Sequence, residues 1–189
     1  ATLALPERFK VVTNLPYQIT AHFLRQLYGD ARFGARPAHS VLMLQREVAQ
    51  RLAAGPGRHS LLSLSVQLFA DVRCEFDVPK INFWPIPKVD SAVVSLALRH
   101  PNSLLNQLNR MAPHHSQPQA LQQMFGLLRT GFAAPRKQLH NNLRAAWPKL
   151  GDARTILQAI GVAADARAQA LSLEQWLALA EKLEIYRNP

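Results

Sequence analysis

The sequence predicts an α/β domain followed by a small all-α domain. Residues 72–78 and part of 91–98 alternate apolar and polar side chains with a period of two, which is typical of half-buried strands. Before them, short apolar runs alternate with segments of helical spacing, as in folds that pack helices on a sheet. The last third of the chain has helical spacing. We therefore expect a sheet domain over 1–100, a linker over 101–118 and a helical domain over 119–189.

Each element of the first hundred residues has its own signal. Apolar runs bounded by polar residues indicate strands, and apolar positions three to four apart indicate helices. Ile19, Phe23 and Leu27 share one helical face, for example, and Gly29 can close that helix. The expected elements, in order, are a strand at 9–12, a helix from Ile19, a loop over 30–39, a strand at 40–44, a helix at 46–54, a turn at 55–59, a helix at 61–70 and an antiparallel hairpin made by 72–78 and 91–98.

The helical domain is expected to contain short amphipathic helices. The last one is introduced by Ser172 and Gln175, which have the spacing of a capping box. An earlier helix carries an apolar stripe made by Leu121, Met124, Phe125, Leu128 and Phe132. Two faces are expected on the helix near 139–143, because Leu139 and Leu143 align on one side of it.

The stretch 14–17, Asn-Leu-Pro-Tyr, follows the first expected strand and precedes the first helix. It therefore lies at the carboxyl end of a strand, where open α/β sheets bind their ligands. The Asn14 amide oxygen and the carbonyl of Leu15 or Pro16 can orient an exocyclic amino group of a base. The Tyr17 ring can hold that base by stacking. The alternative is an ordinary turn in which Asn caps, Pro stiffens and Tyr packs.

The positive charge of the chain is concentrated in one stretch. The formal net charge is +10, and residues 101–150 carry six Lys and Arg but no Asp or Glu. Residues 1–100 carry twelve basic and seven acidic residues, and residues from 151 onward carry four and five. A concentrated basic stretch favours a polyanion, most simply nucleic acid, as partner. Charge that serves solubility is the alternative.

Several motifs together resemble one known family. After 14–17 come Met-Leu-Gln-Arg-Glu-Val at 43–48, Phe-Trp-Pro-Ile-Pro-Lys-Val-Asp-Ser at 83–91 and Arg-Lys-Gln-Leu-His-Asn-Asn-Leu at 136–143. In this order and at these separations, from about Phe9 to near the C-terminus, the chain resembles the ribosomal RNA adenine N6-dimethyltransferases. These are the dimethyladenosine transferases of the small ribosomal subunit. The Asn-Leu-Pro-Tyr and Pro-Lys-Val-Asp-Ser pieces make the resemblance specific.

The resemblance implies the C-terminal part of a class I, Rossmann-like methyltransferase sheet. It implies S-adenosylmethionine as cofactor, with Asn14 beside it, and Phe83 facing the target adenine opposite Tyr17. The alternative is that Phe83 and Trp84 cover a hydrophobic edge. No glycine-rich turn follows a strand in this sequence, so we expect the N-terminal part that grips most of the cofactor to be missing. The expected catalytic residues are Asn14, Leu15, Pro16, Tyr17 and Phe83.

The resemblance also implies contact with RNA through basic side chains. Arg136, His140 and Arg144 are spaced to form one row on a helix, and such a row can track a phosphate backbone. Family members usually carry Gln and a second Arg where this chain has Ala-Pro at 134–135, which weakens a contact-by-contact assignment there. The expected RNA-binding residues are Arg46, Arg51, Lys88, Arg136, Lys137 and Arg144.

These observations favour S-adenosylmethionine-dependent N6-dimethylation of adenines in small-subunit ribosomal RNA, with this chain a truncated form of the enzyme. An inactive basic RNA-binding module is the first alternative. Adenine methylation in DNA, which uses a similar turn, is the second. We expect a cytoplasmic protein, because no apolar run is long enough to cross a bilayer. We also expect a monomer, and the resemblance implies the small ribosomal subunit as its partner.

Two further features are expected to be unrelated to catalysis. Cys74, the one cysteine, alternates with apolar residues and is expected to be a small buried side chain. His114 and His115 are adjacent in a polar segment without converging partners, so we expect no metal site there.

Overall fold

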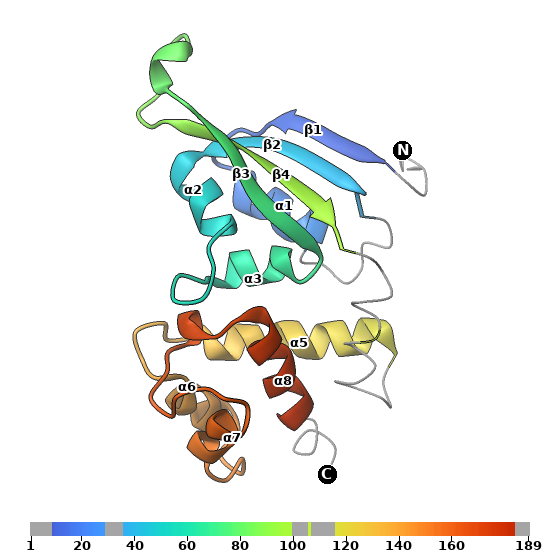
Figure 1. The fold of residues 1–189 in the computed structure, drawn as a ribbon, viewed down its shortest axis with the longest axis vertical. Coiled ribbons are helices and arrows are strands. Elements are labelled where there is room, and N and C mark those ends of the chain that lie inside the picture. The colour runs from blue at the N-terminus through green and yellow to red at the C-terminus, as the bar shows by residue number, and fades with distance from the viewer. Residues whose placement is uncertain (1–8, 29–35, 100–105, 107–115, 184–189) are drawn as a thin grey trace. The chain divides into compact units, whose positions relative to one another are not determined.

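The computed structural model describes residues 9–28, 36–99, 106 and 116–183. Figure 1 shows the order of the elements along the chain. The chain divides into two compact units, one made by residues 1–54 and 65–100 and the other by residues 55–64 and 101–189. Gly29 and the His114–His115 pair lie outside the described residues, as does most of the linker expected at 101–118.

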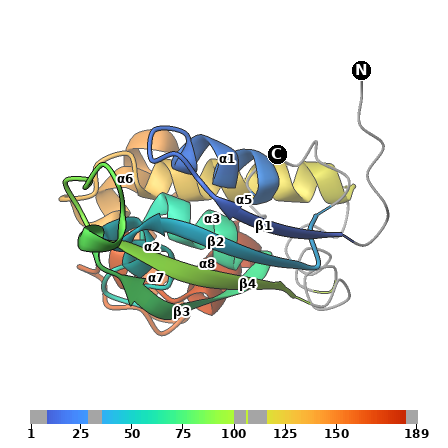
Figure 2. The ribbon, with the colours of Figure 1, turned by 90° about the horizontal axis from the view of Figure 1, so that it is seen from above.

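The first unit is built on a mixed four-stranded sheet with strand order β1-β2-β4-β3. Figure 2 shows the four strands side by side in this order. β1 and β2 are parallel, and β4 runs antiparallel to both β2 and β3. The α/β class and the antiparallel hairpin predicted from the sequence are therefore confirmed. The strands are β1 (Lys10–Asn14), β2 (His39–Gln45), β3 (Ala70–Val78) and β4 (Ser91–Leu98).

One face of the sheet is buried beneath helices. Leu42 of β2 pairs with Val94 of β4, and both side chains are fully buried. The buried Tyr28 of α1 fixes that helix to the same face, because its hydroxyl lies 2.8 Å from Oγ of Ser40 in β2. On the opposite face, Val12 of β1 is 78% exposed. The helices that begin in this part of the chain are α1 (Thr20–Tyr28), α2 (Arg46–Leu52) and α3 (Leu61–Gln67).

The helix expected at 61–70 ends earlier than its apolar pattern predicted. α3 ends at Gln67, and a turn closed by Phe69 N–H donating to the Val66 carbonyl leads directly into β3. Ala70 pairs with Leu98 of β4, so the strand begins where the helix was expected to continue. A short apolar run does not by itself distinguish a buried helix from a buried strand.

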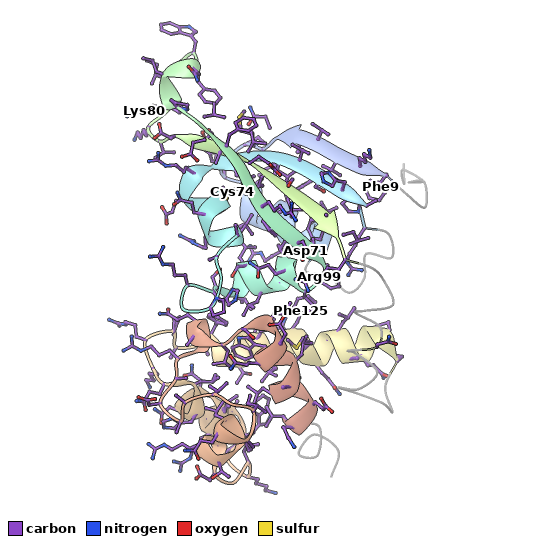
Figure 3. The ribbon with its side chains drawn as sticks, viewed as in Figure 1. Phe9, Asp71, Cys74, Lys80, Arg99 and Phe125 are labelled. Carbon is purple, nitrogen blue, oxygen red and sulfur yellow. The ribbon has the colours of Figure 1, made fainter. Side chains whose placement is uncertain are left out.

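Cys74 is exposed, which contradicts the prediction that it is buried. β3 is the edge strand of the sheet, and Ala70 is the one fully buried residue among its nine. A β-bulge between Cys74 and Phe76 shifts the register with β4, and Phe76 is also exposed. Alternation along an edge strand therefore does not imply that a helix covers its apolar positions. Figure 3 labels Cys74 on this strand.

The second unit contains short helices packed around Trp176, which is fully buried. The Trp176 ring stacks on Phe132, with 5.8 Å between ring centroids. The capping box predicted for Ser172 and Gln175 is confirmed, because each side chain bonds the backbone N–H of the other residue. α5 starts at Gln117, inside the segment expected to be linker. The helices are α5 (Gln117–Gly131), α6 (Leu139–Ala146), α7 (Ala153–Ala159) and α8 (Leu173–Leu183).

Candidate active site

Two segments far apart in the sequence line one open pocket of the first unit. The pocket has a volume of about 290 Å³. One wall is the turn that follows β1, and the other comes from the loop between β3 and β4. The lining residues are Asn14, Leu15, Pro16, Tyr17, Phe83, Trp84, Pro85 and Pro87.

The turn after β1 is held by its backbone. Leu15 is buried, and its N–H donates to the carbonyl of Met43 in β2 at 3.3 Å. The carbonyl of Pro16 accepts from the N–H of Ile19 at 3.1 Å and from the hydroxyl of Thr20 at 3.3 Å. Among the described residues, no hydrogen bond engages the carbonyl of Leu15. Of the two carbonyls considered from the sequence, that of Leu15 is therefore the better acceptor for a ligand.

Tyr17 is fixed by a contact that crosses the pocket wall. Its hydroxyl lies 2.8 Å from Oγ of Ser91, which is buried at the start of β4. The hydrogen bond holds the half-buried ring at its hydroxyl end. The side chain therefore cannot rotate freely, and the ring keeps its orientation. A ring held in this way loses little further side-chain entropy when another ring stacks on it.

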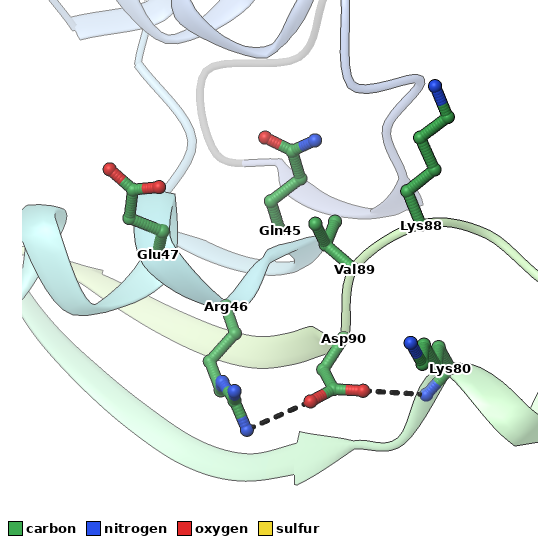
Figure 4. A pocket seen from close by; sticks show the side chains of 7 residues that line it. All are labelled: Gln45, Arg46, Glu47, Lys80, Lys88, Val89 and Asp90. Atoms are coloured by element: carbon green, nitrogen blue, oxygen red, sulfur yellow. Dashed lines mark hydrogen bonds and ion pairs between the residues drawn. The ribbon is translucent and has the colours of Figure 1, made fainter.

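Asp90 connects the loop between β3 and β4 to the start of α2. One carboxylate oxygen accepts from the backbone N–H of Lys80 at 3.0 Å, and the other lies 3.0 Å from the Arg46 guanidinium. The backbone N–H of Arg46 also donates to the Asp90 carbonyl at 3.0 Å. Figure 4 shows both side-chain interactions. Asp90 and Ser91, adjacent in sequence, thereby fix the loop that carries Phe83 and the ring of Tyr17.

The match to known proteins supplies the family. A family model described as Ribosomal RNA adenine dimethylase matches residues 3–184 of this chain. The chain belongs to the ribosomal RNA adenine dimethylase family. The resemblance found in the sequence motifs is thereby confirmed.

Curated relatives of this chain carry the name Ribosomal RNA small subunit methyltransferase A. The protein from Thermosynechococcus vestitus is 40% identical over 178 residues, which cover 92% of this chain and 62% of the relative. The protein from Crocosphaera subtropica is 39% identical over 175 residues, covering 90% of this chain and 59% of the relative. This chain thus spans about three fifths of the length of these relatives.

Two solved structures have a similar fold. The 23S rRNA methyltransferase ErmE matches with a TM-score of 0.70 at 24% identity, covering 97% of this chain and 68% of that one. A dimethyladenosine transferase from Plasmodium falciparum matches with a TM-score of 0.72 at 22% identity, covering 97% and 69%. At these identities the likeness establishes the fold, which is Rossmann-like as predicted.

The basic residues expected to bind RNA differ in their surroundings in this chain. Arg46 is paired with Asp90 and lies 3.9 Å from Asp77, and Arg51 is paired with Glu47 one helical turn away. Lys88 is exposed and forms no ion pair with any residue in the described ranges. Its side chain points away from Asp90 (Figure 4). Of the three predicted RNA-binding residues in the first unit, Lys88 is therefore the most available for a phosphate.

The row expected from Arg136, His140 and Arg144 does not form. α6 begins at Leu139, so Arg136 lies in the preceding turn, and His140 is only 3% exposed. The His140 ring contacts the Ala164 carbonyl through Nδ1 at 3.0 Å and the Arg154 guanidinium through Nε2 at 3.3 Å. His140 thus belongs to the buried face that the apolar spacing assigned to its neighbours. Arg136, Lys137 and Arg144 themselves are exposed.

The described residues contain neither a metal cluster nor a membrane span. No group of three or more His, Cys, Asp and Glu side chains in those ranges is arranged to hold a metal ion. Within the same ranges, every helix is too short or too polar to cross a bilayer.

Sequence motifs located most of this site but missed three of its residues. Lys80 had no assigned role, Trp84 was considered only as a cover for a hydrophobic edge, and Asp90 was noted only as part of the Pro-Lys-Val-Asp-Ser motif. The contacts of Asp90 and Ser91 join residues up to 74 positions apart in sequence, so no local pattern reveals them. The motif itself was the available signal, because it places two hydrogen-bonding side chains directly before a strand.

Proposed function

We propose that this protein acts in the N6-dimethylation of adenines in small-subunit ribosomal RNA, with S-adenosylmethionine as methyl donor. The observation that carries the proposal is the pocket in which the turn Asn14–Leu15–Pro16–Tyr17 faces Phe83. The family and the printed names of its relatives support the substrate class. Since the chain is shorter than those relatives, the activity is proposed for the protein to which this chain belongs.

The acceptors in the turn suit an exocyclic amino group. The Asn14 side-chain oxygen and the Leu15 carbonyl, which no described residue engages, would accept hydrogen bonds from the two N6–H groups of an adenine, and this would aim the nitrogen lone pair out of the ring plane. Pro16 contributes by bending the backbone, while its own carbonyl stays bonded within the turn. Such positioning acts on the orientation of the reacting atoms.

The two aromatic rings suit an adenine that has left its stack. Tyr17 and Phe83 are both half-buried and line opposite segments of the pocket. An extruded base is commonly held between aromatic or apolar side chains while its edge is read by hydrogen bonds. We assign Tyr17 and Phe83 this role, with Tyr17 held in place by Ser91.

The pocket fits only part of the cofactor. S-adenosylmethionine supplies an electrophilic methyl group when bound, and Asn14 is the residue of this chain that we place beside it. The described glycines at 55 and 57 lie in a turn after α2. The usual glycine-rich nucleotide-binding turn follows a strand, so these glycines do not form one. We propose that most cofactor contacts come from residues outside this chain, as the greater length of the relatives supports.

Exposed basic residues of both units would hold the RNA backbone. We propose Lys88, Arg136, Lys137 and Arg144 as the principal phosphate contacts, with Arg46 and Arg51 secondary because each is paired with a carboxylate. A monomer acting in the cytoplasm suits this substrate. A chain with few cofactor contacts also suits the second candidate, an RNA-binding module without activity of its own.

The decisive experiment measures methyl transfer and cofactor binding separately. Small ribosomal subunits would be incubated with radiolabelled S-adenosylmethionine and the protein, and the RNA digested to nucleosides. Appearance of N6,N6-dimethyladenosine with the full-length protein, and its loss in Asn14→Ala, are expected. Calorimetry of this chain with S-adenosylmethionine is expected to give weak binding or none. Methyl transfer that persists fully in Asn14→Ala would remove the turn from the mechanism.

A further inference from the structure

Trp84 is the most exposed aromatic side chain among the described residues. Its exposed fraction is 94%, and it stands on the loop between β3 and β4 beside the pocket residue Phe83. Ile81 and Ile86 of the same loop are also exposed. Exposed apolar side chains that gather in one place mark surfaces that bind something.

The loop that carries Trp84 is fixed at both ends. Phe83 N–H donates to the Lys80 carbonyl at 3.2 Å, and Asn82 N–H donates to the Pro79 carbonyl at 3.1 Å. Asp90, at the other end of the loop, accepts a hydrogen bond from the backbone N–H of Lys80. Pro85, directly after Trp84, restricts the backbone further. The backbone that carries the indole is therefore held in place, and a ligand that stacks on the ring would order little additional backbone.

The loop that carries Trp84 also carries two lysines. Lys80 and Lys88 lie on the same loop, are exposed, and form no ion pairs within the described part of the chain. Figure 3 shows Lys80 at the end of the hairpin remote from Asp71. The nearest carboxylate of the loop, Asp90, is engaged by Arg46. An aromatic ring and unpaired cations on one loop are a combination that can bind single-stranded nucleic acid.

We propose that Trp84 is a stacking site for an unpaired nucleobase next to the adenine that enters the pocket, with Lys80 and Lys88 neutralising phosphates beside it. The inference rests on the proposed function, because Trp84 lines the same pocket as Tyr17 and Phe83. Removing a base from its stack exposes the faces of its neighbours, and an indole at the pocket rim can cover one of them. Continuity with the pocket favours a nucleobase over a lipid surface or a protein.

The test uses this chain and short single-stranded RNA carrying 2-aminopurine, a fluorescent adenine analogue, at its centre. Three otherwise identical oligoadenylates would be compared: one intact, one abasic on the 5′ side of the 2-aminopurine and one abasic on the 3′ side. Affinity is measured by anisotropy, and entry of the central base into the pocket by its fluorescence intensity. The variants are Trp84→Ala, Trp84→Phe, Ile86→Ala as an exposed apolar control and Tyr17→Ala as the pocket control.

One of the two abasic RNAs lacks the base that stacks on Trp84, so Trp84 should add nothing to the affinity for that RNA. Trp84→Ala should weaken binding of the intact RNA about tenfold, the loss typical of one base–aromatic stack. It should cause no loss on the oligonucleotide that lacks the stacked neighbour. Trp84→Phe should keep most of the affinity, and Ile86→Ala should bind like the unaltered chain. Because Trp84 is exposed, the melting temperature should be unchanged in all Trp84 variants.

The two proposals fail in different ways. An equal loss in Trp84→Ala on all three RNAs, or no loss on any, would overturn the stacking site. If Tyr17→Ala leaves the 2-aminopurine signal unchanged while Trp84→Ala behaves as expected, the pocket assignment fails and the stacking surface stands. Absence of binding by the unaltered chain would overturn both. If Trp84→Ala weakens binding to anionic vesicles but not to RNA, the loop would be assigned to a membrane instead.

Discussion

The hydroxyl of Tyr17 lies 2.8 Å from Oγ of Ser91, and this contact joins the turn after β1 to the first residue of β4. The two residues are 74 positions apart. Ser91 follows Asp90, whose carboxylate holds the loop that carries Phe83. The relative placement of the two rings that we assign to the adenine thus depends on two adjacent side chains.

We expect Tyr17→Phe and Tyr17→Ala to separate two effects: the hydrogen bond that holds the ring, and the stacking of a base on the ring. Tyr17→Phe removes one partly buried hydrogen bond, so it should lower the free energy of unfolding by about 1 kcal/mol and keep most single-turnover activity. Tyr17→Ala removes the stacking surface and should lose about 1 to 3 kcal/mol of base-holding free energy. Single-turnover methylation measured beside thermal unfolding separates the effects. Equal activity per folded molecule in both variants would count against stacking.

Asn14→Ala in the full-length enzyme should lower turnover far more than RNA affinity. The side chain is exposed in the turn and makes no hydrogen bond within the described part of the protein, so its loss should leave the melting temperature almost unchanged. The lost contact acts on the amino group at the reacting centre, whereas the distributed phosphate contacts remain. Rapid-quench methylation and filter binding measure the two quantities. A parallel fall in affinity and turnover would argue against orientation of the amino group.

Asp90→Asn should reduce methylation because it loosens the loop that carries Phe83, and not because it destabilises the fold. The amide oxygen can still accept from Lys80 N–H, but the ion pair with Arg46 is lost. Because Arg46 is about half exposed, that pair should contribute at most about 1 kcal/mol to stability. Asp71→Asn is a matched control, since Asp71 forms a comparable 2.9 Å ion pair with Arg99 away from the pocket. A rise in KM for RNA in Asp90→Asn alone, at equal melting temperature, is the expected result.

The sequence was sufficient for most of the elements, though not for all of their ends, and for one wall of the pocket. Strand and helix periodicity placed the hairpin and the helices, and Asn14 and Tyr17 were found because their turn is a contiguous motif. The facing of Phe83 and Tyr17 came from the family resemblance, not from the residues. The joint made by Asp90 could not be derived, because a carboxylate in a motif does not indicate which distant N–H or guanidinium it will meet.

Two errors show where local periodicity misleads. Cys74 alternates like a buried residue but lies on an edge strand interrupted by a bulge. His140 has the spacing of a surface row but is buried, with polar partners on Ala164 and Arg154 that the sequence does not identify. In both cases burial depends on which element packs opposite, and spacing alone does not contain that information.

Cys74 should react slowly with alkylating reagents although it is exposed. Partial desolvation, followed by the negative charges of Asp77 and Glu75, raises the pKa of its thiol. The reactive thiolate is therefore scarcer near neutral pH than in a free cysteine, and the alkylation rate should rise only at higher pH. Asp77→Asn should shift the pH–rate curve toward lower pH. Iodoacetamide labelling followed by mass spectrometry measures both curves, and a midpoint below that of free cysteine would contradict the expectation.

Two glycine-to-alanine substitutions in α5 should change stability in opposite directions. A Cβ on Gly131 would lie 2.2 Å from the ring of the buried Trp176 and 3.1 Å from Cδ1 of Leu139, so one of these packed side chains must move. Gly131→Ala should therefore destabilise the protein by about 1 to 3 kcal/mol, the range for overpacked cores. Gly126 lies within the same helix, and a Cβ there would meet nothing within 4 Å. Gly126→Ala should stabilise by about 0.5 to 1 kcal/mol because alanine favours the helix. Urea unfolding followed by circular dichroism measures both, and a Gly131→Ala variant as stable as the unaltered chain would show that Trp176 can shift at little cost.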